Sequence, residues 1–512
     1  MLEKRAILIV SCLVILLVTI PYLVAFQASN AEYDFGGFLI NPTDGHSYLA
    51  KMQQGYRGNW KFVLPYTADQ GEGAYLFLFY IGLGHIARII NLPLALVYHI
   101  SRLISAIILL WSMSVLFRTV FNETKWQVLG FSIAALGSGL GWIGVLFGYF
   151  TSDFWVSEAY PFLSMYTNPH FCLGLSMVIL ALIPGKERRP VYYFILAFAL
   201  GLVMPFAVVI VILVLGVSTA VEFTDNVEDI QGHIKHSPYL QRLVIFGLCG
   251  GGVILYQYWR IVTDPVLFIW NEQNITPSPT VLDLLFSLSP CLIIGTIGIK
   301  QAWKNNKGRL LVLWAAISLI LIFIPWNLQR RFLTGIYLPL AGLSVYGLKL
   351  IVEKLSLRVG TLAIVLFCLI VPTNIIVLIS GLQASVQHDD RIFISMSVKE
   401  GLEWITSNTS TDNIVLANEE IGLYIPSITG RRVVYGHPFE TVNAEKEREF
   451  VKSFFSGDLS PANVQVNLEQ KGIDFIFSNN VGETGEVDWL DGMDYPLVFS
   501  NDDVYIYYIA QP

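Results

Sequence analysis

The residues best suited to chemistry lie in hydrophilic stretches between long apolar runs. The first stretch, NPTDGHSYLAKMQQGYRGNW, contains Asp44 and His46, two residues apart beside Pro42 and Gly45. A carboxylate in such a turn can take a proton from an acceptor hydroxyl, or hold a divalent cation such as Mg²⁺ or Mn²⁺ together with His46. Asp44 is equally well placed to cap the helix predicted over 47–55, and the two roles are compatible.

A second stretch, TSDFWVSEAYPFLSMYTNPHF, places Asp153, Glu158 and His170 among aromatic residues such as Trp155. Acidic groups and histidine can bind a metal or sugar hydroxyls while aromatic rings stack on the sugar. Aromatic residues also serve as anchors at a membrane interface. For each acid taken alone, a structural role is the favoured interpretation.

A third stretch, PWNLQRRFLTGIYLPL, carries Arg330 and Arg331 where one apolar run ends and the next begins. Guanidinium groups match phosphate oxygens in a planar, bidentate way, so this pair is a candidate phosphate-binding site. The alternative is that both side chains extend to lipid headgroups.

Two further stretches are weaker candidates. DPVLFIWNEQNITPSP offers Trp270, Gln273 and Asn274, and amides beside Trp are typical of sugar-binding surfaces, although a proline-bounded loop has the same composition. GRRVVYGHPFETVNAEK offers His437, Glu440 and Thr441 after a predicted strand. These residues could face the membrane site or stabilise a turn, and the second interpretation is favoured.

The composition indicates the class of protein, and therefore the kind of elements that position these residues. Of 512 residues, 54% are hydrophobic and only 14% are charged, which is typical of a polytopic membrane protein. The net charge of −7 sums a nearly uncharged apolar part and an acidic C-terminal part, so it does not bear on nucleic-acid binding. The sequence has no basic stripe that would bind a phosphate backbone. All five cysteines fall inside apolar runs, without disulfide or zinc spacing.

About eleven transmembrane helices are predicted from runs of roughly 17–25 residues with little charge. The runs cover about 6–26, 94–117, 126–148, 169–184, 191–203, 205–222, 242–260, 281–299, 309–326, 333–352 and 360–381. A cytoplasmic N-terminus places the basic loops on the cytoplasmic side, as the positive-inside rule requires. These loops contain Arg118/Lys125, Lys186/Arg188/Arg189, Lys235, Lys300/Lys304/Lys307/Arg309 and Lys349/Lys354/Arg358. With this orientation Arg330 and Arg331 lie on the extracytoplasmic side. Their position runs against the positive-inside rule, so a specific role is expected for the pair.

Two regions leave the count open. The run at 74–91 is interrupted by His85 and Arg88, and counting it as a span would reverse every later loop, so it is predicted to be an amphipathic helix in the outer interface. The short runs within 191–222 meet at Met204-Pro205 and are predicted to form a broken or hairpin pair.

From about residue 385 the pattern changes to that of a small α/β domain. Helices are predicted over SVKEGLEWITSN and KEREFVKSFF, and strands over NIVLAN, RRVVYGH and GIDFIFSN. The predicted organisation is a transmembrane domain over 1–384, including a long first outer loop over 27–93, and an extracytoplasmic soluble domain over 385–512.

This arrangement resembles the GT-C superfamily of polyprenyl-phosphate-dependent glycosyltransferases, which includes protein mannosyltransferases, oligosaccharyltransferases and aminoarabinose transferases. TDGHSYLAKMQQG, TNPHF, LQRRFLTGIYLPL and GRRVVYGHPFET are similar to segments of an uncharacterised bacterial family of such membrane proteins. The paired-acid motif is not matched, because Asp44 is followed by Gly and His.

The resemblance implies a multi-pass enzyme of a bacterial plasma membrane. Its donor would be a sugar on a polyprenyl phosphate, and its acceptor a hydroxyl of a lipid, glycan or protein. Asp44 would be the base of an inverting transfer and the candidate ligand of any cation, and Asp153 or Glu158 the second-loop acid. Arg330 and Arg331 would hold the departing phosphate.

Two other functions remain open from the sequence. A transporter can also use broken helices such as 191–222, although few ionisable residues lie within the spans and no repeat between halves is detected. A non-catalytic envelope protein that binds glycan or lipid through its outer domain is the third interpretation.

Overall fold

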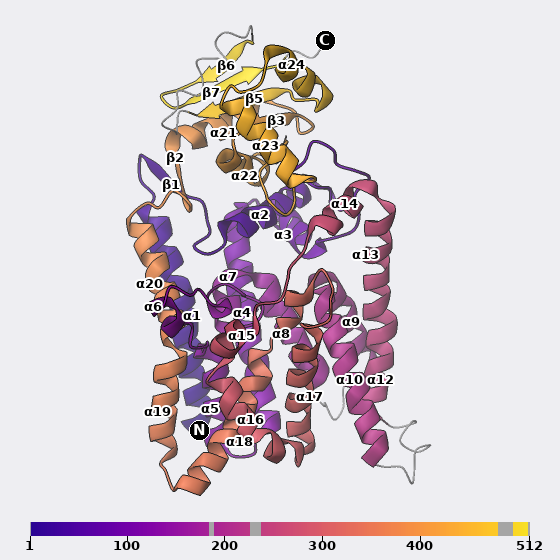
Figure 1. The fold of residues 1–512 in the computed structure, drawn as a ribbon, viewed down its shortest axis with the longest axis vertical. Coiled ribbons are helices and arrows are strands. Elements are labelled where there is room, and N and C mark those ends of the chain that lie inside the picture. The colour runs from indigo at the N-terminus through magenta and orange to yellow at the C-terminus, as the bar shows by residue number, and fades with distance from the viewer. Residues whose placement is uncertain (1, 184–188, 226–236, 480–494, 510–512) are drawn as a thin grey trace. The chain divides into compact units, whose positions relative to one another are not determined.

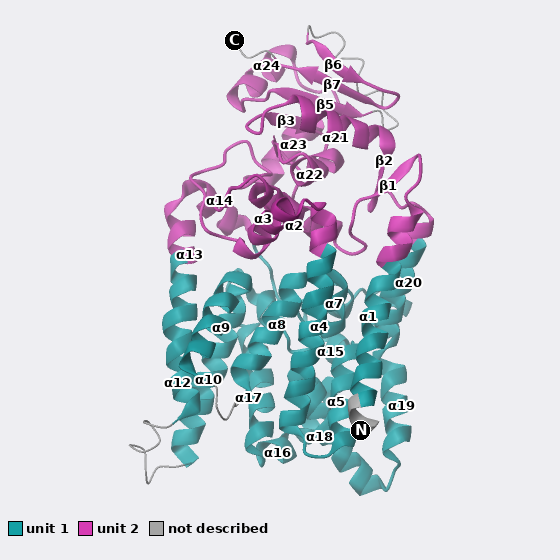
Figure 2. Ribbon diagram, turned by 180° about the vertical axis from the view of Figure 1, so that it is seen from behind, with its two compact units in different colours: residues 1–21, 99–256, 275–383 teal, residues 22–98, 257–274, 384–512 magenta. Residues whose placement is uncertain are grey.

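The computed structural model describes residues 2–183, 189–225, 237–479 and 495–509 (Figure 1). The chain forms two compact units, coloured separately in Figure 2. The helical unit comprises Met1–Pro21, His99–Tyr256 and Ile275–Gln383, and the mixed unit comprises Tyr22–Tyr98, Gln257–Asn274 and Ala384–Pro512.

The helical unit contains, in whole or in part, the apolar helices of the chain. They are α1 (Leu2–Ala28), α4 (Leu94–Val120), α5 (Thr124–Leu136), α6 (Gly141–Leu146), α7 (Pro161–Thr167), α8 (Pro169–Leu182), α9 (Pro190–Val203), α10 (Pro205–Asp225), α12 (Pro238–Ile245), α13 (Gly251–Thr263), α15 (Val281–Leu288), α16 (Cys291–Trp303), α17 (Asn306–Leu321), α18 (Tyr337–Leu355), α19 (Val359–Ile370) and α20 (Pro372–Val386). Shorter turns are the 3₁₀ helices η1 (Ser152–Phe154) and η4 (Gln329–Leu333) and the π-helix η3 (Phe246–Gly250).

Among the described residues, five helical segments are long and apolar enough to cross a membrane. They are Arg5–Ala28, Leu94–Val120, Thr124–Leu146, Pro205–Asp225 and Pro238–Thr263. Two bent pairs, α15 with α16 (79°) and α19 with α20 (43°), raise the number to seven if each pair is one span. The count of eleven stays a prediction, because several predicted runs form helices that are short or broken.

The predicted break at Met204-Pro205 is confirmed, because α9 ends at Val203 and α10 begins at Pro205. Proline lacks the backbone N–H that would continue the helix, and its fixed φ suits the first helical position. The Met204 N–H still donates to the Leu200 carbonyl, so the first helix is closed before the break.

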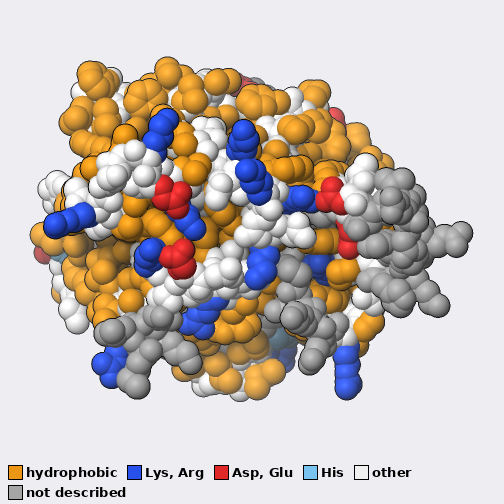
Figure 3. All heavy atoms as spheres, turned by 90° about the horizontal axis from the view of Figure 1, so that it is seen from below, with side chains coloured by type: hydrophobic (Ala, Val, Ile, Leu, Met, Phe, Trp, Pro, Cys, Tyr) orange, Lys and Arg blue, Asp and Glu red, His pale blue; other side chains and the backbone are white. Residues whose placement is uncertain are grey.

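Basic side chains gather at one end of the helical unit. Figure 3 shows this face, with many Lys and Arg side chains and few acidic ones. Arg118, Lys300 and Lys354 end α4, α16 and α18 there, and Lys349 pairs with Glu123 at 3.4 Å. Lys186, Arg188 and Lys235 lie outside the described residues, and the cytoplasmic assignment of this face stays a prediction.

The mixed unit contains all the strands of the described chain and seven helices. The helices are α2 (Pro42–Tyr56), α3 (Leu78–Ile90), α14 (Pro265–Gln273), α21 (Met396–Asn408), α22 (Glu419–Ile428), α23 (Ala444–Phe455) and α24 (Pro461–Gln470). The strands are β1 (Tyr33–Phe35), β2 (Phe393–Ser395), β3 (Ile414–Ala417), β4 (Arg432–Val433), β5 (Phe475–Asn479), β6 (Leu497–Ser500) and β7 (Val504–Tyr508).

A five-stranded sheet of order β4-β3-β5-β7-β6 is the centre of the mixed unit. The first three strands are parallel and the last two antiparallel, so the predicted βαβ pattern is confirmed in β3, β4 and β5. Side chains alternate between two apolar clusters, since Val415 and Ala417 pack in one and Ile414 and Leu416 in the other. Both faces of the sheet are therefore covered.

The first long loop belongs to the same unit as this sheet. β1 pairs antiparallel with β2, and Ala50 and Tyr66 pack in one of the apolar clusters of the sheet. The sequence grouped residues 27–93 with the transmembrane domain, whereas these long-range contacts group them with the C-terminal residues.

The helix predicted over 74–91 is α3, which at 13 residues is shorter than the roughly 20 needed to cross a bilayer. It packs closely on α2, because a Cβ on Gly84 would overlap the Met52 carbonyl and one on Gly55 would overlap the Ile81 carbonyl. Its place at a membrane interface remains a prediction.

Candidate active site

Asp44 lies in the first turn of α2, which begins at Pro42 rather than at residue 47. Asn41 precedes the helix in a left-handed conformation (φ 50°), and no side chain caps the helix start. The prediction that Asp44 caps the helix is therefore wrong. Asn41 Nδ2 donates to Asp44 Oδ2, and the Asp44 side chain is 37% exposed.

One face of α2 contacts the turn formed by residues 437–441. Asp44, Ser47 and Lys51 share this face, because residues three and four apart are neighbours on a helix. Ser47 Oγ and Lys51 Nζ both donate to Glu440 Oε1, each at 2.5 Å. His437 Nε2 lies 3.8 Å from Asp44 Oδ1.

Lys51 and Glu440 form a buried ion pair, with side chains 1% and 10% exposed. The ammonium also lies 4.5 Å from the centre of the Phe77 ring. Burial by itself opposes ionisation of Glu440. The charges of Lys51 and His437, with the hydrogen bonds from Lys51 and Ser47, outweigh it and hold the pKa of Glu440 below its usual value.

The ring of His437 is oriented by its own turn. Its Nδ1 accepts hydrogen bonds from the backbone N–H groups of Phe439 (3.1 Å) and Glu440 (3.2 Å). Burial lowers the pKa of His437, which favours the neutral imidazole. Since Nδ1 is the acceptor, the proton of the neutral ring is on Nε2, which faces Asp44.

His46 points to a different environment. Its Nδ1 lies 3.0 Å from Ser427 Oγ, and its ring packs at 4.4 Å from that of Tyr424. Complete burial lowers the pKa of His46 to about 3, so the ring is neutral. The expectation that Asp44 and His46 act together at one site is not met within this unit, because residues two apart face different sides of a helix.

The residues around Asp44 do not form a good cation site. Asp44 contributes one carboxylate, and His437 presents an N–H rather than a lone pair, so it cannot be a ligand in this tautomer. Across the described residues, no three His, Cys, Asp or Glu side chains gather in a way that could hold a metal.

Gln273 and Asn274, predicted to bind sugar, brace the 437–441 turn instead. Gln273 Nε2 donates to the Thr441 carbonyl, and its Oε1 accepts from the Asn443 N–H at 3.0 Å. Asn274 Nδ2 donates to the Phe439 carbonyl at 2.9 Å. The Trp270 ring lies edge-on to Phe77 at 6.2 Å, within an apolar cluster.

Asp153 is fully buried in the helical unit and organises a loop. Its carboxylate accepts from Thr151 Oγ1 (2.5 Å) and from the N–H groups of Gly139 and Gly141 (both 3.1 Å). A Cβ on Gly141 would overlap this carboxylate. These contacts favour the structural interpretation of Asp153.

The structure brings the second-loop residues and the arginine pair together within the helical unit. Arg331 donates to Glu158 Oε1 at 3.0 Å, and the Glu158 side chain is 5% exposed. The Arg330 guanidinium lies 4.7 Å from the centre of the Trp155 ring. His170, at the start of α8, packs on Phe171 with ring centres 4.0 Å apart.

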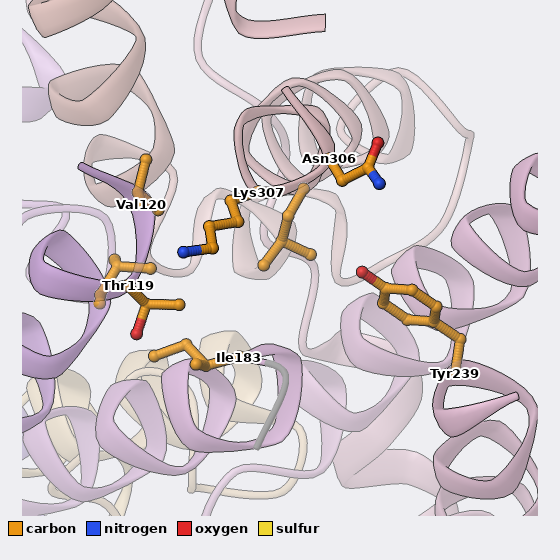
Figure 4. Close-up of a pocket in the computed structure, with 8 residues that line it drawn as sticks. Thr119, Val120, Ile183, Tyr239, Asn306 and Lys307 are labelled. Carbon is orange, nitrogen blue, oxygen red and sulfur yellow. The ribbon is translucent and has the colours of Figure 1, made fainter. Parts of the chain in front are cut away.

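A separate cavity of about 60 Å³ lies in the helical unit (Figure 4). It is lined by Leu116, Thr119, Val120, Ile183, Tyr239, Asn306, Lys307 and Leu310. None of the predicted site residues lines it, and it has room for little more than water.

The sequence did not predict that Lys51 of α2 pairs with Glu440 or that His437 lies beside Asp44. Ser47 and Lys51 are not among the predicted site residues, and for His437 and Glu440 the sequence favours a turn over a role at the site. The available signal was the spacing of Asp44, Ser47 and Lys51, which places three polar groups on one helix face.

No family model matches the chain, and no curated protein sequence matches it. Solved structures do. The apo oligosaccharyltransferase of Archaeoglobus fulgidus matches with a TM-score of 0.59 and 14% identity, covering 93% of this chain and 69% of that one. The archaeal oligosaccharyltransferase AglB of that organism, with an inhibitory peptide and a dolichol-phosphate, matches with a TM-score of 0.50 and 13% identity, over 90% and 69%.

The arabinofuranosyltransferase AftD from Mycobacteria matches with a TM-score of 0.50 and 14% identity, covering 98% of this chain and 41% of that one. These structures are glycosyltransferases of the GT-C superfamily. The chain shares their fold, which is the fold that the sequence resemblance implied. It is a multi-pass membrane protein by its apolar helices and by this fold.

Proposed function

We propose that the chain is a membrane glycosyltransferase that moves a sugar from a polyprenyl-phosphate donor to an acceptor hydroxyl on the extracytoplasmic side. The fold supports the class, and one matching structure is an oligosaccharyltransferase in complex with a dolichol-phosphate. The observation that carries the proposal is the position of Asp44. Its carboxylate is partly exposed at a helix start and faces the N–H of a neutral, buried histidine.

Asp44 acts as the general base of an inverting displacement. The acceptor oxygen attacks the anomeric carbon on the face opposite the phosphate, and Asp44 takes the hydroxyl proton. The bond between the anomeric carbon and the phosphate oxygen breaks, and its electron pair leaves with the polyprenyl phosphate. Base assistance of this kind contributes about 10²–10⁴ in rate.

Arg330 and Arg331 are the candidates for stabilising the departing phosphate. The Arg330 guanidinium lies over the Trp155 ring, and a guanidinium can bind phosphate oxygens in a planar, bidentate way. Glu158 holds Arg331, so this acid is a positioning residue rather than a base. Negative charge that grows on the leaving oxygen favours such cationic contacts in the transition state.

The test uses the purified full chain in lipid nanodiscs with labelled polyprenyl-phosphate hexoses and pentoses, and a glycan and lipid extract of bacterial membranes as acceptor. The proposal predicts transfer of label from at least one donor, with inversion of the anomeric configuration in the product as read by NMR. Transfer with retention would contradict the role of Asp44. Lack of transfer from every donor would favour the transporter or the non-catalytic binding protein.

A further inference from the structure

His437 Nε2 is a buried hydrogen-bond donor without a partner in the structure. The side chain is 2% exposed, and Nε2 makes no hydrogen bond. Buried N–H groups are rarely left unpaired in native proteins, and the exceptions need an explanation. Asp44 Oδ1 lies 3.8 Å from this atom, which is too long for a hydrogen bond.

The distance between these two atoms suits hydrogen bonds to one shared oxygen. Two atoms 3.8 Å apart can both lie about 2.8 Å from a common oxygen placed beside the line that joins them. A hydroxyl is the group that satisfies both atoms, because it accepts from the histidine N–H and donates its own proton to the carboxylate. Asp44 Oδ2 is already an acceptor from Asn41, so Oδ1 is the oxygen available for this contact.

The surrounding turn fixes the donor in place. Nδ1 accepts from two backbone N–H groups, and the His437 ring packs on the Tyr66 ring with centres 5.4 Å apart. Glu440, three residues on, is tied to α2 through Lys51 and Ser47. The contacts of Glu440 with Lys51 and Ser47 hold the turn that carries His437 against α2, which carries Asp44. These contacts involve neither the Asp44 nor the His437 side chain.

We infer that Asp44 Oδ1 and His437 Nε2 together form the subsite that holds the acceptor hydroxyl, a role for His437 that rests on the proposed function. His437 donates to one lone pair of the hydroxyl oxygen, and the proton of the hydroxyl points to Asp44. The other lone pair is left to attack the anomeric carbon. His437 is thus an acceptor-binding residue that stays neutral through the reaction.

Two substitutions separate this role from a structural one. H437N keeps an acceptor near the position of Nδ1 and loses the donor at the position of Nε2. H437Q does the opposite, since its amide reaches the position of Nε2 but cannot serve both backbone N–H groups. H85N is the matched control, because His85 in the same unit stacks on Trp60 and contacts the Asn59 carbonyl.

The kinetic experiment uses the full chain, the donor that wild type accepts, and glycerol as a simple acceptor hydroxyl. H437N is expected to lower kcat/KM for glycerol by about 10–100-fold with the donor KM unchanged, and H437Q to lose less. H85N is expected to match wild type. Equal activity of wild type and H437N, or a greater loss in H437Q than in H437N, would overturn the inference and leave the proposed function standing.

A second measurement does not depend on turnover. A high-resolution structure of the full chain in glycerol is expected to show one oxygen within hydrogen-bond distance of both Asp44 Oδ1 and His437 Nε2, and to lack it in H437N. If this oxygen is present but the chain transfers no sugar, the proposed function is wrong and the hydroxyl subsite is supported. An empty gap in wild type, or an oxygen that persists unchanged in H437N, would overturn the subsite.

Discussion

Lys51 Nζ and Glu440 Oε1 lie 2.5 Å apart, in a buried ion pair that joins α2 to a turn almost four hundred residues later in the chain. Removing one partner of such a pair leaves an uncompensated buried charge, whereas replacing both by apolar groups is often neutral. The pair therefore fixes the place of the turn that carries His437.

K51M is expected to destabilise the mixed unit by about 3–5 kcal/mol, because the Glu440 carboxylate loses its cation. The double variant K51M/E440M is expected to recover most of this loss. Thermal unfolding of the purified chain, followed by tryptophan fluorescence, measures both. If K51M unfolds like wild type, the pair does not hold the turn.

Burial of His46 predicts a pH dependence of stability. Its pKa is lowered from 6.5 to about 3 in the folded chain, so below pH 6.5 the unfolded chain takes up a proton that the folded chain does not. Stability contributed by neutral His46 is therefore lost as the pH falls from 6.5 toward 3, by up to about 1.4 kcal/mol per pH unit.

H46N, which keeps a donor for Ser427, is expected to reduce this slope in unfolding measured between pH 7 and pH 4. The slope should not vanish, because burial lowers the pKa of His437 in the same direction. An identical slope in wild type and H46N would show that His46 titrates as freely in the folded chain as in the unfolded one.

The packing of Gly141 against Asp153 predicts that one added methyl group lowers the stability of the chain. G141A places a Cβ against the Asp153 carboxylate, and moving this buried acid would break its hydrogen bonds to Ser138, Gly139, Gly141 and Thr151. We expect a loss of about 1–3 kcal/mol, typical of overpacking. G82A in α3 is the control, since its Cβ meets nothing within 4 Å, and it should be neutral or stabilising. Equal unfolding temperatures for the two variants would contradict the structural role of Asp153.

The arginine pair predicts different effects for two substitutions. R330K keeps the charge but loses the guanidinium that lies over Trp155 and its bidentate match to phosphate, so we expect the donor KM to rise about tenfold with little change in the acceptor KM. R331M leaves the buried Glu158 carboxylate without its cation and should lower stability first. A donor KM unchanged in R330K would remove Arg330 from the phosphate site.

The sequence predicted the elements that depend on local pattern. The break at Met204-Pro205 follows from proline chemistry, and β3, β4 and β5 follow from short apolar runs bounded by turn residues. The start of α2 was placed five residues late, because Pro42 is a good first helical residue that the prediction assigned to a turn.

What the sequence did not predict depends on long-range contacts. β1 pairs with β2 across some 360 residues, and no local pattern in three residues encodes that partner. For the same reason the sequence favoured a turn for Glu440 and His437 and did not predict that Glu440 pairs with Lys51 or that His437 faces Asp44. Gln273 and Asn274 were predicted as sugar ligands from composition, but their amides are used by the backbone of that turn.

Single-turnover transfer by D44N measures whether Asp44 removes the acceptor proton. With the donor concentration above its dissociation constant, we expect D44N to transfer sugar about 10²–10⁴ times more slowly than wild type. Donor affinity and unfolding temperature should be unchanged. Transfer by D44N at the wild-type rate would rule out Asp44 as the base.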